Sequence, residues 1–335
     1  MNPRHRRLLI PGLLIALLIV VLVSSVVGRA ESAETDPVVV SHIDDPRVQE
    51  SSGLAMSRAD DDLAYTINDS DNSPTVYAVR VSTGEVVGAT SISGGTLQDT
   101  EAIGMGPGGV LWIADTGDNR ERRTDVALYA LPEPGAGDHS VTAKRYPVTY
   151  EGGPANVEAL LVDPITGAKS LVSKALLAGT IYALPATLRT DGANRATVVD
   201  EGAPSLVTDG SMTADGRHAL LRSYVSASVV DTSTWRSVGS EPLPSQPQGE
   251  SITIERSDRT FLIGSEGERS ALIRLPLTIP ETTEPSASPT DPAAIQSPPQ
   301  RSPGDSDGFA GATWFWAAAV MAMLAAIAVA ATKRT

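Results

Sequence analysis

The chain has 335 residues, no cysteine and a net charge of −14 at pH 7. This charge argues against nucleic acid and against anionic membrane surfaces as partners, because both repel carboxylates. The lack of cysteine excludes disulfides and thiol catalysis, so the fold must be held by its apolar core.

Residues 1–33 are predicted to be a signal peptide or an uncleaved membrane anchor. Arg4, Arg6 and Arg7 precede an apolar run over 8–27, and small residues around Ala30 suit a cleavage site. The run is long for a signal peptide, so both outcomes stay open. Either one predicts that the residues that follow are exported.

Residues 37–278 are predicted to form a single all-β domain built from repeated units. Each unit starts with an acidic residue, followed by a short apolar strand, a tight turn and a second strand. The starts lie at intervals of 51, 57, 51 and 41 residues, at Glu50, Glu101, Glu158, Asp209 and Glu250.

Two further strands follow in most units, as over 75–81 and 85–93 in the first and over 125–131 and 141–150 in the second. Four antiparallel strands per unit form one blade of a propeller. The last unit lacks its fourth strand, and residues 37–43 supply a spare one. We therefore predict a five-bladed β-propeller closed by pairing of its two ends, which removes exposed edges. A six-bladed propeller is the alternative, if the longer second or third unit hides a blade.

Antiparallel pairing brings the start of a first strand to the end of the second strand. Each repeated acid should then face the residue that ends the hairpin, as Glu158 faces Lys174 and Asp209 faces Arg222. These positions predict a ligand-binding face around the mouth of a central channel. Its predicted residues are Glu50, Glu101, Glu158, Asp209, Glu250, Lys174, Arg222 and Glu266.

The loops at 68–72 and 115–119 are near copies, with the sequences Asn-Asp-Ser-Asp-Asn and Asp-Thr-Gly-Asp-Asn. Closely spaced carboxylate and amide oxygens are what a hard cation such as calcium binds. The predicted ligands are Asp69, Glu101, Asp115, Asp118 and Asn119. Two structural alternatives stay open: the loops are Asx-turns, or the repeated acids bond backbone N–H groups of the neighbouring blade.

No catalytic residue is predicted. The chain has no Gly-x-Ser-x-Gly sequence, and the exported histidines fall away from the acids. His42 and His139 are expected on outer strands, and His218 at the opposite end of a hairpin from the acids.

Residues 279–308 are rich in Pro, Ser, Thr and acidic residues and are predicted to form a disordered stalk. The apolar run over 309–332 is long enough for a transmembrane helix, and 333–335 would be its cytoplasmic tail. The predicted location is the cell membrane, with the propeller on its outer side.

Several motifs resemble a largely uncharacterised family of exported, membrane-anchored actinobacterial β-propeller proteins. The segments concerned include Glu-Ser-Ser-Gly-Leu-Ala at 50–55, Ala-Asp-Thr-Gly-Asp-Asn at 114–119 and Gln-Gly-Glu-Ser-Ile at 248–252. Such proteins are grouped loosely with phytase-like or esterase-like propellers. The resemblance implies an exported, membrane-anchored propeller.

The acid-lined face leads us to expect that this domain binds a ligand or protein partner there, with a divalent cation as a candidate cofactor.

The alternative that this resemblance implies is a calcium-dependent hydrolase, because phytase-like propellers are similar in using calcium and acidic residues on one face. In that case Glu101, Asp115 and Asp118 would hold the metal. Lys174 and Arg222 would orient an anionic substrate.

Overall fold

The computed structural model describes residues 36–69 and 73–280, which form an all-β domain. These residues belong to one compact unit that ends at Glu281. The predicted signal segment, the transmembrane run, the tail and all but the first two residues of the stalk lie outside the described residues. Within the part that is described, we find no helix with the length and apolar character needed to cross a membrane.

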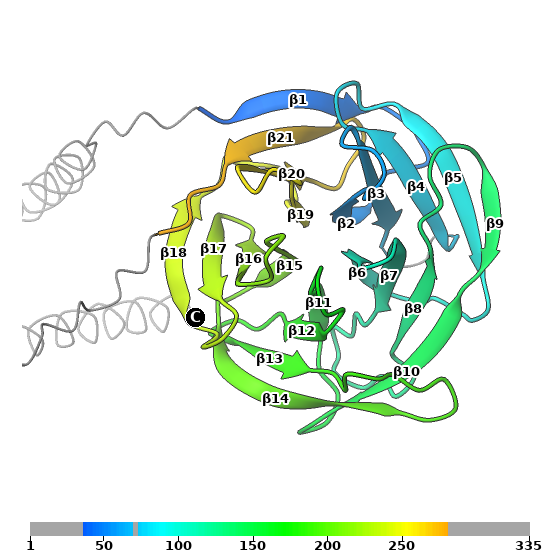
Figure 1. The fold of residues 1–335 in the computed structure, drawn as a ribbon, viewed down its shortest axis with the longest axis vertical. Helices are drawn as coiled ribbons and strands as arrows, with labels where there is room; N and C mark the ends of the chain where they lie inside the picture. Colours follow the sequence, from blue (N-terminus) through cyan, green and yellow to red (C-terminus); the bar gives the residue numbers. More distant parts are fainter. Residues whose placement is uncertain (1–35, 70–72, 281–335) are drawn as a thin grey trace, which may run out of the picture. The chain divides into compact units, whose positions relative to one another are not determined.

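Most strands of the first two units lie at the positions that the repeat predicts (Figure 1). In the first unit they are β2 (Ser51–Met56), β3 (Leu63–Asn68), β4 (Thr75–Arg80) and β5 (Val86–Ser93). In the second they are β6 (Thr100–Gly106), β7 (Val110–Asp115), β8 (Ala127–Pro132), β9 (His139–Thr142) and β10 (Lys144–Tyr150).

The remaining units follow the same order, and the last is completed by the first strand of the chain. The third contains β11 (Val157–Val162), β12 (Lys169–Ser173), β13 (Gly179–Ala183) and β14 (Asn194–Ala203). The fourth contains β15 (Val207–Met212), β16 (His218–Ser223), β17 (Ser226–Asp231) and β18 (Ser237–Pro242). The fifth contains β19 (Ser251–Ile254), β20 (Thr260–Gly264), β21 (Ser270–Pro276) and β1 (Val38–Ile43).

The first strands of the five units surround a common centre (Figure 1). Each first strand contacts the first strand of the next unit: β2 contacts β6, β6 contacts β11, β11 contacts β15, and β15 contacts β19. The ring closes where β19 contacts β2. Apolar side chains fill the space between neighbouring sheets, and each of five buried clusters takes residues from two adjacent units. Because both faces of the inner strands are covered in this way, every residue of β2, β3 and β11 is buried.

One predicted strand is wrong in its extent. The expected single strand over 141–150 consists of two strands, β9 and β10, separated at Ala143. β9 pairs in parallel with β5 of the preceding unit, whereas β10 pairs antiparallel with β8 and in parallel with β14 of the next unit. The segment therefore joins three units at their outer edge, where unpaired backbone groups would otherwise be left exposed.

The prediction that residues 37–43 complete the last unit is confirmed. β1 pairs antiparallel with β21, with Val39 opposite Ile273 and Ile43 opposite Ser270. The turn after β4 lies against this strand, because a Cβ on Gly84, at φ +75°, would come within 1.9 Å of the His42 carbonyl oxygen. The start of the described chain thus packs against both its first and its last unit.

Replacing Ile43 with alanine tests how much this closure stabilises the ring. Ile43 is 1% exposed, and we expect Ile43→Ala to lower the free energy of unfolding by about 2–5 kcal/mol, as other large core truncations do. Val38 on the same strand is 56% exposed, so Val38→Ala should change it by less than about 0.5 kcal/mol. Urea unfolding measures both, and equal effects would contradict a closing role for β1.

Candidate functional site

Acidic side chains gather at one end of the five hairpins, where each first strand begins and each second strand ends. We call this cluster the acidic basin; its residues are Asp69, Asp99, Glu101, Glu158, Glu250 and Glu266. Glu101 and Glu158 lie in β6 and β11, and the other four lie just outside strand ends. The basin therefore brings together carboxylates from four of the five units.

Three basin residues are close enough to share one cation. Asp69, Asp99 and Glu101 each offer a carboxylate oxygen, and these atoms lie within 4.8 Å of one another. At that separation, two unit charges repel by about 3 kcal/mol at an effective dielectric near 20. Something must therefore balance them, whether a proton or a cation.

Glu101 is the deepest of the three, at 6% exposure. Its carboxylate forms no hydrogen bond or ion pair with the described residues, and only burial and neighbouring charges act on it. Burial, followed by the charge of Glu158, raises the pKa of Glu101 well above its ordinary value. Burial and then Asp69 raise the pKa of Asp99 to about 7. Glu101 and Asp99 therefore hold their protons to a higher pH than ordinary carboxyls do.

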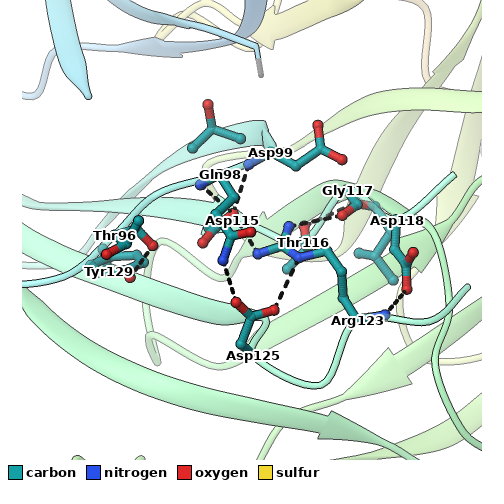
Figure 2. Close-up of polar contacts among 12 residues, drawn as sticks. Thr96, Gln98, Asp99, Asp115, Thr116, Gly117, Asp118, Arg123, Asp125 and Tyr129 are labelled. Carbon is teal, nitrogen blue, oxygen red and sulfur yellow. Dashed lines mark hydrogen bonds and ion pairs between the residues drawn. The ribbon is translucent and has the colours of Figure 1, made fainter. Parts of the chain in front are cut away.

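Asp99 owes its position to Asp115 (Figure 2). The Oδ1 atom of Asp115 accepts hydrogen bonds from the backbone N–H of Gln98 at 3.1 Å and of Asp99 at 2.9 Å. The backbone of Gly117 also donates to the Asp99 carbonyl oxygen, at 3.1 Å. These bonds fix the segment that leads into β6 and hold Asp99 beside Glu101.

Gly117 makes room for the two carboxylates. A Cβ at this position would lie 2.2 Å from Oε1 of Glu101 and 2.5 Å from Cγ of Asp99. Since atoms cannot approach so closely, any other residue would displace a carboxylate. The glycine of the predicted loop at 115–119 is therefore part of the site.

The other predicted metal ligands have structural partners instead. Asp115 is 1% exposed and pairs with Nη2 of Arg123 at 3.0 Å. Oδ2 of Asp118 accepts from the backbone N–H of Arg122 and Arg123, and Oδ1 of Asn119 accepts from the Asn156 amide at 3.4 Å. These bonds form a local carboxylate-capped turn, the alternative that the sequence left open. Of the predicted ligands, Asp69 and Glu101 come together, and Asp99 joins them.

Lys174 is the cation of the basin. Its Nζ atom pairs with Oε2 of Glu158 at 3.1 Å, as the hairpin register predicts, and lies 5.1 Å from the centre of the Tyr224 ring. Burial acts to lower the pKa of Lys174, but the charges of Glu158 and Glu250 outweigh it and raise that pKa. Lys174 therefore stays charged and partly neutralises this side of the basin.

Asp209 and Arg222, which were predicted to bind ligand, pair in register and lie inside the domain and not on an open face. Both side chains are 0% exposed. Oδ2 of Asp209 accepts from the backbone N–H of Ile252 at 2.8 Å, and Nη1 of Arg222 donates to the carbonyl oxygens of Ser251 and Gly264 at 2.6 and 2.7 Å. Here the acid bonds the backbone of the neighbouring unit, which is the structural alternative.

A one-residue difference in register explains why the repeated acids are unequal. Glu101 and Glu158 are the extra residues at β-bulges, between Thr100 and Ala102 and between Val157 and Ala159. In the fourth unit the bulge lies at the residue just before Asp209, so Asp209 itself is regularly paired. Because a one-residue slip reverses the direction of a side chain, the two classes of acid have different surroundings.

The remaining predicted residues lie at the border of the basin or away from it. Glu50 is exposed before β2, and its charge acts on Glu266. The described histidines fall where the sequence places them, His42 in β1, His139 in β9 and His218 at the start of β16.

Comparison with known proteins adds little to this geometry. No protein-family model matches the chain, and no curated protein matches it. Among solved structures, the crystal structure of a nidogen/laminin complex is similar, with a TM-score of 0.42, 14% identity and coverage of 65% of this chain and 73% of that chain. This likeness is one of all-β architecture, and no inference about function is drawn from it.

Proposed function

We propose that the domain is a five-bladed β-propeller that binds a divalent cation in its acidic basin. Calcium is the cation that we propose. The ring of five inner strands, closed by β1 on the last unit, supports the blade count. The buried carboxylate of Glu101, with no hydrogen-bond donor among the described residues and two more carboxylates within 4.8 Å, is the observation that carries the metal proposal.

The donor set fits calcium better than a softer metal. Asp69, Asp99 and Glu101 supply carboxylate oxygens only, and hard cations prefer such ligands. Gly117 leaves space beside two of these side chains. Calcium takes six to eight oxygens, so three carboxylates would leave positions for water or for oxygens of a bound molecule.

We further propose that the basin binds an unidentified ligand or protein partner at the cell envelope. The basin carries six carboxylates and Lys174, so a partner would reach the cation through its own oxygens and Lys174 through an anionic group. The sequence of 1–33 and 309–332 supports an extracytoplasmic domain held at the membrane.

The cation proposal is tested by thermal unfolding of the full chain. Calcium at 100 times its Kd should stabilise the protein by about 2.7 kcal/mol, which raises Tm by about 5–10 °C for a domain of this size. Glu101→Gln should abolish this rise, whereas Glu85→Gln, an exposed acid in the turn after β4, should keep it. The proposal fails if millimolar calcium leaves the Tm of the wild-type protein unchanged.

The hydrolase alternative would share the cation site but needs different residues. Arg222 is buried and bonded to backbone carbonyls, so it has no access to a substrate, and Asp115 and Asp118 are held by the loop around Arg123. Lys174 keeps its proposed role. Turnover of a phosphate-ester panel that is lost in Glu101→Gln would favour a hydrolase over a binding domain.

A further inference from the structure

The opposite end of the ring holds a second, separate site. The five inner strands and the turns that follow them enclose a cavity of about 410 Å³. The basin lies where these strands begin, whereas the cavity is lined by their later residues, such as Met56 of β2 and Met105 of β6. Its volume is within the usual range of small-molecule sites, about 300–1,000 Å³.

The walls of the cavity combine polar side chains with apolar, adaptable ones. Met56, Met105 and Met212 contribute from three different inner strands, together with Val162 and Ile254. Methionine side chains are flexible and polarisable, so they adjust to the shape of an apolar molecule. This apolar part of the wall can pack against a chain of methylene groups.

The cavity shares no lining residue with the basin. Gly210 lines the cavity, whereas the adjacent Asp209 is 0% exposed and its carboxylate is bonded to the backbone of Ile252. The cavity and the basin are therefore treated as two sites at opposite ends of the inner strands.

The mouth carries a cation without an anionic partner. Arg58 and Arg256 both border the cavity. Arg256 pairs with Asp61 at 2.8 Å, and its Nη1 donates to the Arg58 carbonyl oxygen at 2.8 Å. The exposed guanidinium of Arg58 forms no ion pair with the residues of 36–69 and 73–280.

The acidic residues at the mouth of the cavity already accept hydrogen bonds from other residues of the domain. Glu255 receives two hydrogen bonds from Arg274, at 2.6 and 2.7 Å. Both carboxylate oxygens of Asp258 accept from the backbone N–H of Ala214, at 3.1 and 3.0 Å. Arg58 is thus the group at the mouth that can bind an added negative charge.

We propose that this cavity binds an elongated amphiphile, with its alkyl chain between the inner strands and its carboxylate at Arg58. The site is independent of the cation proposed for the basin. The probe we choose is dodecanoate, with a diazirine on the chain for covalent capture by light.

The test uses the full chain in lipid nanodiscs, followed by peptide mapping of the labelled residues. We expect saturable labelling of β2, β6 and β15, with at least tenfold better competition by dodecanoate than by dodecylamine. Labelling only outside the cavity, or labelling that does not saturate, would overturn the proposal. Equal competition by the amine would overturn the assignment of the carboxylate to Arg58.

Two variants separate the cavity from general partition into lipid. Met212→Trp should fill the cavity and reduce labelling at least tenfold, while leaving any calcium-dependent rise in Tm intact. Where this variant fails to fold, Met105→Phe serves the same purpose. Arg58→Ala should keep the labelling and lose the preference for dodecanoate; unchanged labelling in the filled variants would refute the site.

Discussion

Replacing Arg222 with methionine is expected to lower the free energy of unfolding by about 3–5 kcal/mol, the usual cost of leaving a buried charge without its partner. Arg222 is 0% exposed. Its Nη1 joins β16 to the carbonyl oxygens of Ser251 and Gly264, and its Nη2 donates to Oε1 of Gln246 at 2.7 Å. Methionine has a similar length but no donors, so three acceptors would lose their donor and the buried Asp209 would lose a nearby positive charge.

A double-mutant cycle with Asp209→Asn separates the charge from the hydrogen bonds. Burial already raises the pKa of Asp209 well above its ordinary value, and burial lowers that of Arg222 to about 10. An asparagine keeps an oxygen for the Ile252 backbone N–H, so Asp209→Asn alone should be mild. The double variant should be more stable than the sum of the single losses implies, by about 0.5–3 kcal/mol. Strict additivity in urea unfolding would show that the two charges do not interact.

The contrast between Arg222 and Lys174 shows how far the sequence could be taken. Both cations stand near the ends of second strands, and the hairpin register correctly places each across from an acid. The register does not tell how deeply either side chain is buried. Lys174 lies at the basin, whereas Arg222 is covered by β19 and β20 of the next unit, and that difference depends on packing between units.

Regular local patterns were predictable, and irregular ones were not. The second strands expected after each tight turn are found in the first two units as β3 and β7, because nearly continuous apolar runs end at clear turn residues. The division of 141–150 into β9 and β10 depends on which outer strands lie alongside, information that is absent from the segment itself.

Asp99 illustrates the same limit at the site. It lies before β6 and outside the repeated pattern, so nothing in the repeat marks it as a ligand. Its position comes from the backbone bonds that Asp115 accepts. The loop at 115–119 was predicted to supply metal ligands. Its contribution to the site is to hold Asp99 beside Glu101.

In the presence of a chelator, and over the range from pH 5 to 8, the protein is expected to be most stable at pH 5 and to lose stability as the pH rises. Burial, followed by the charge of Asp69, raises the pKa of Asp99 to about 7. Burial, then Glu250, does the same for Glu266, also to about 7. In the unfolded chain these carboxyls would lose their protons near pH 4.

The sign follows from proton counting. Between about pH 4 and 7 the folded protein holds protons that the unfolded chain has released, so each rise in pH favours unfolding. Carboxylates with a lowered pKa, such as Asp45 beside Arg47, give the opposite slope, but they act below about pH 4. Thermal unfolding at pH 5, 6, 7 and 8 measures the trend, and a Tm that increases over this range would contradict it.

Calcium should reverse this trend, because a cation replaces the protons that the basin gives up. At pH 8 the stabilisation by calcium should be greatest, and below pH 7 the apparent affinity should fall by about tenfold per pH unit for each proton displaced. Asp99→Asn removes one of those protons together with one ligand. It should therefore weaken calcium binding at pH 8 and also flatten the dependence of affinity on pH. A variant that binds more weakly with an unchanged pH slope would show that Asp99 is not the group from which calcium displaces a proton.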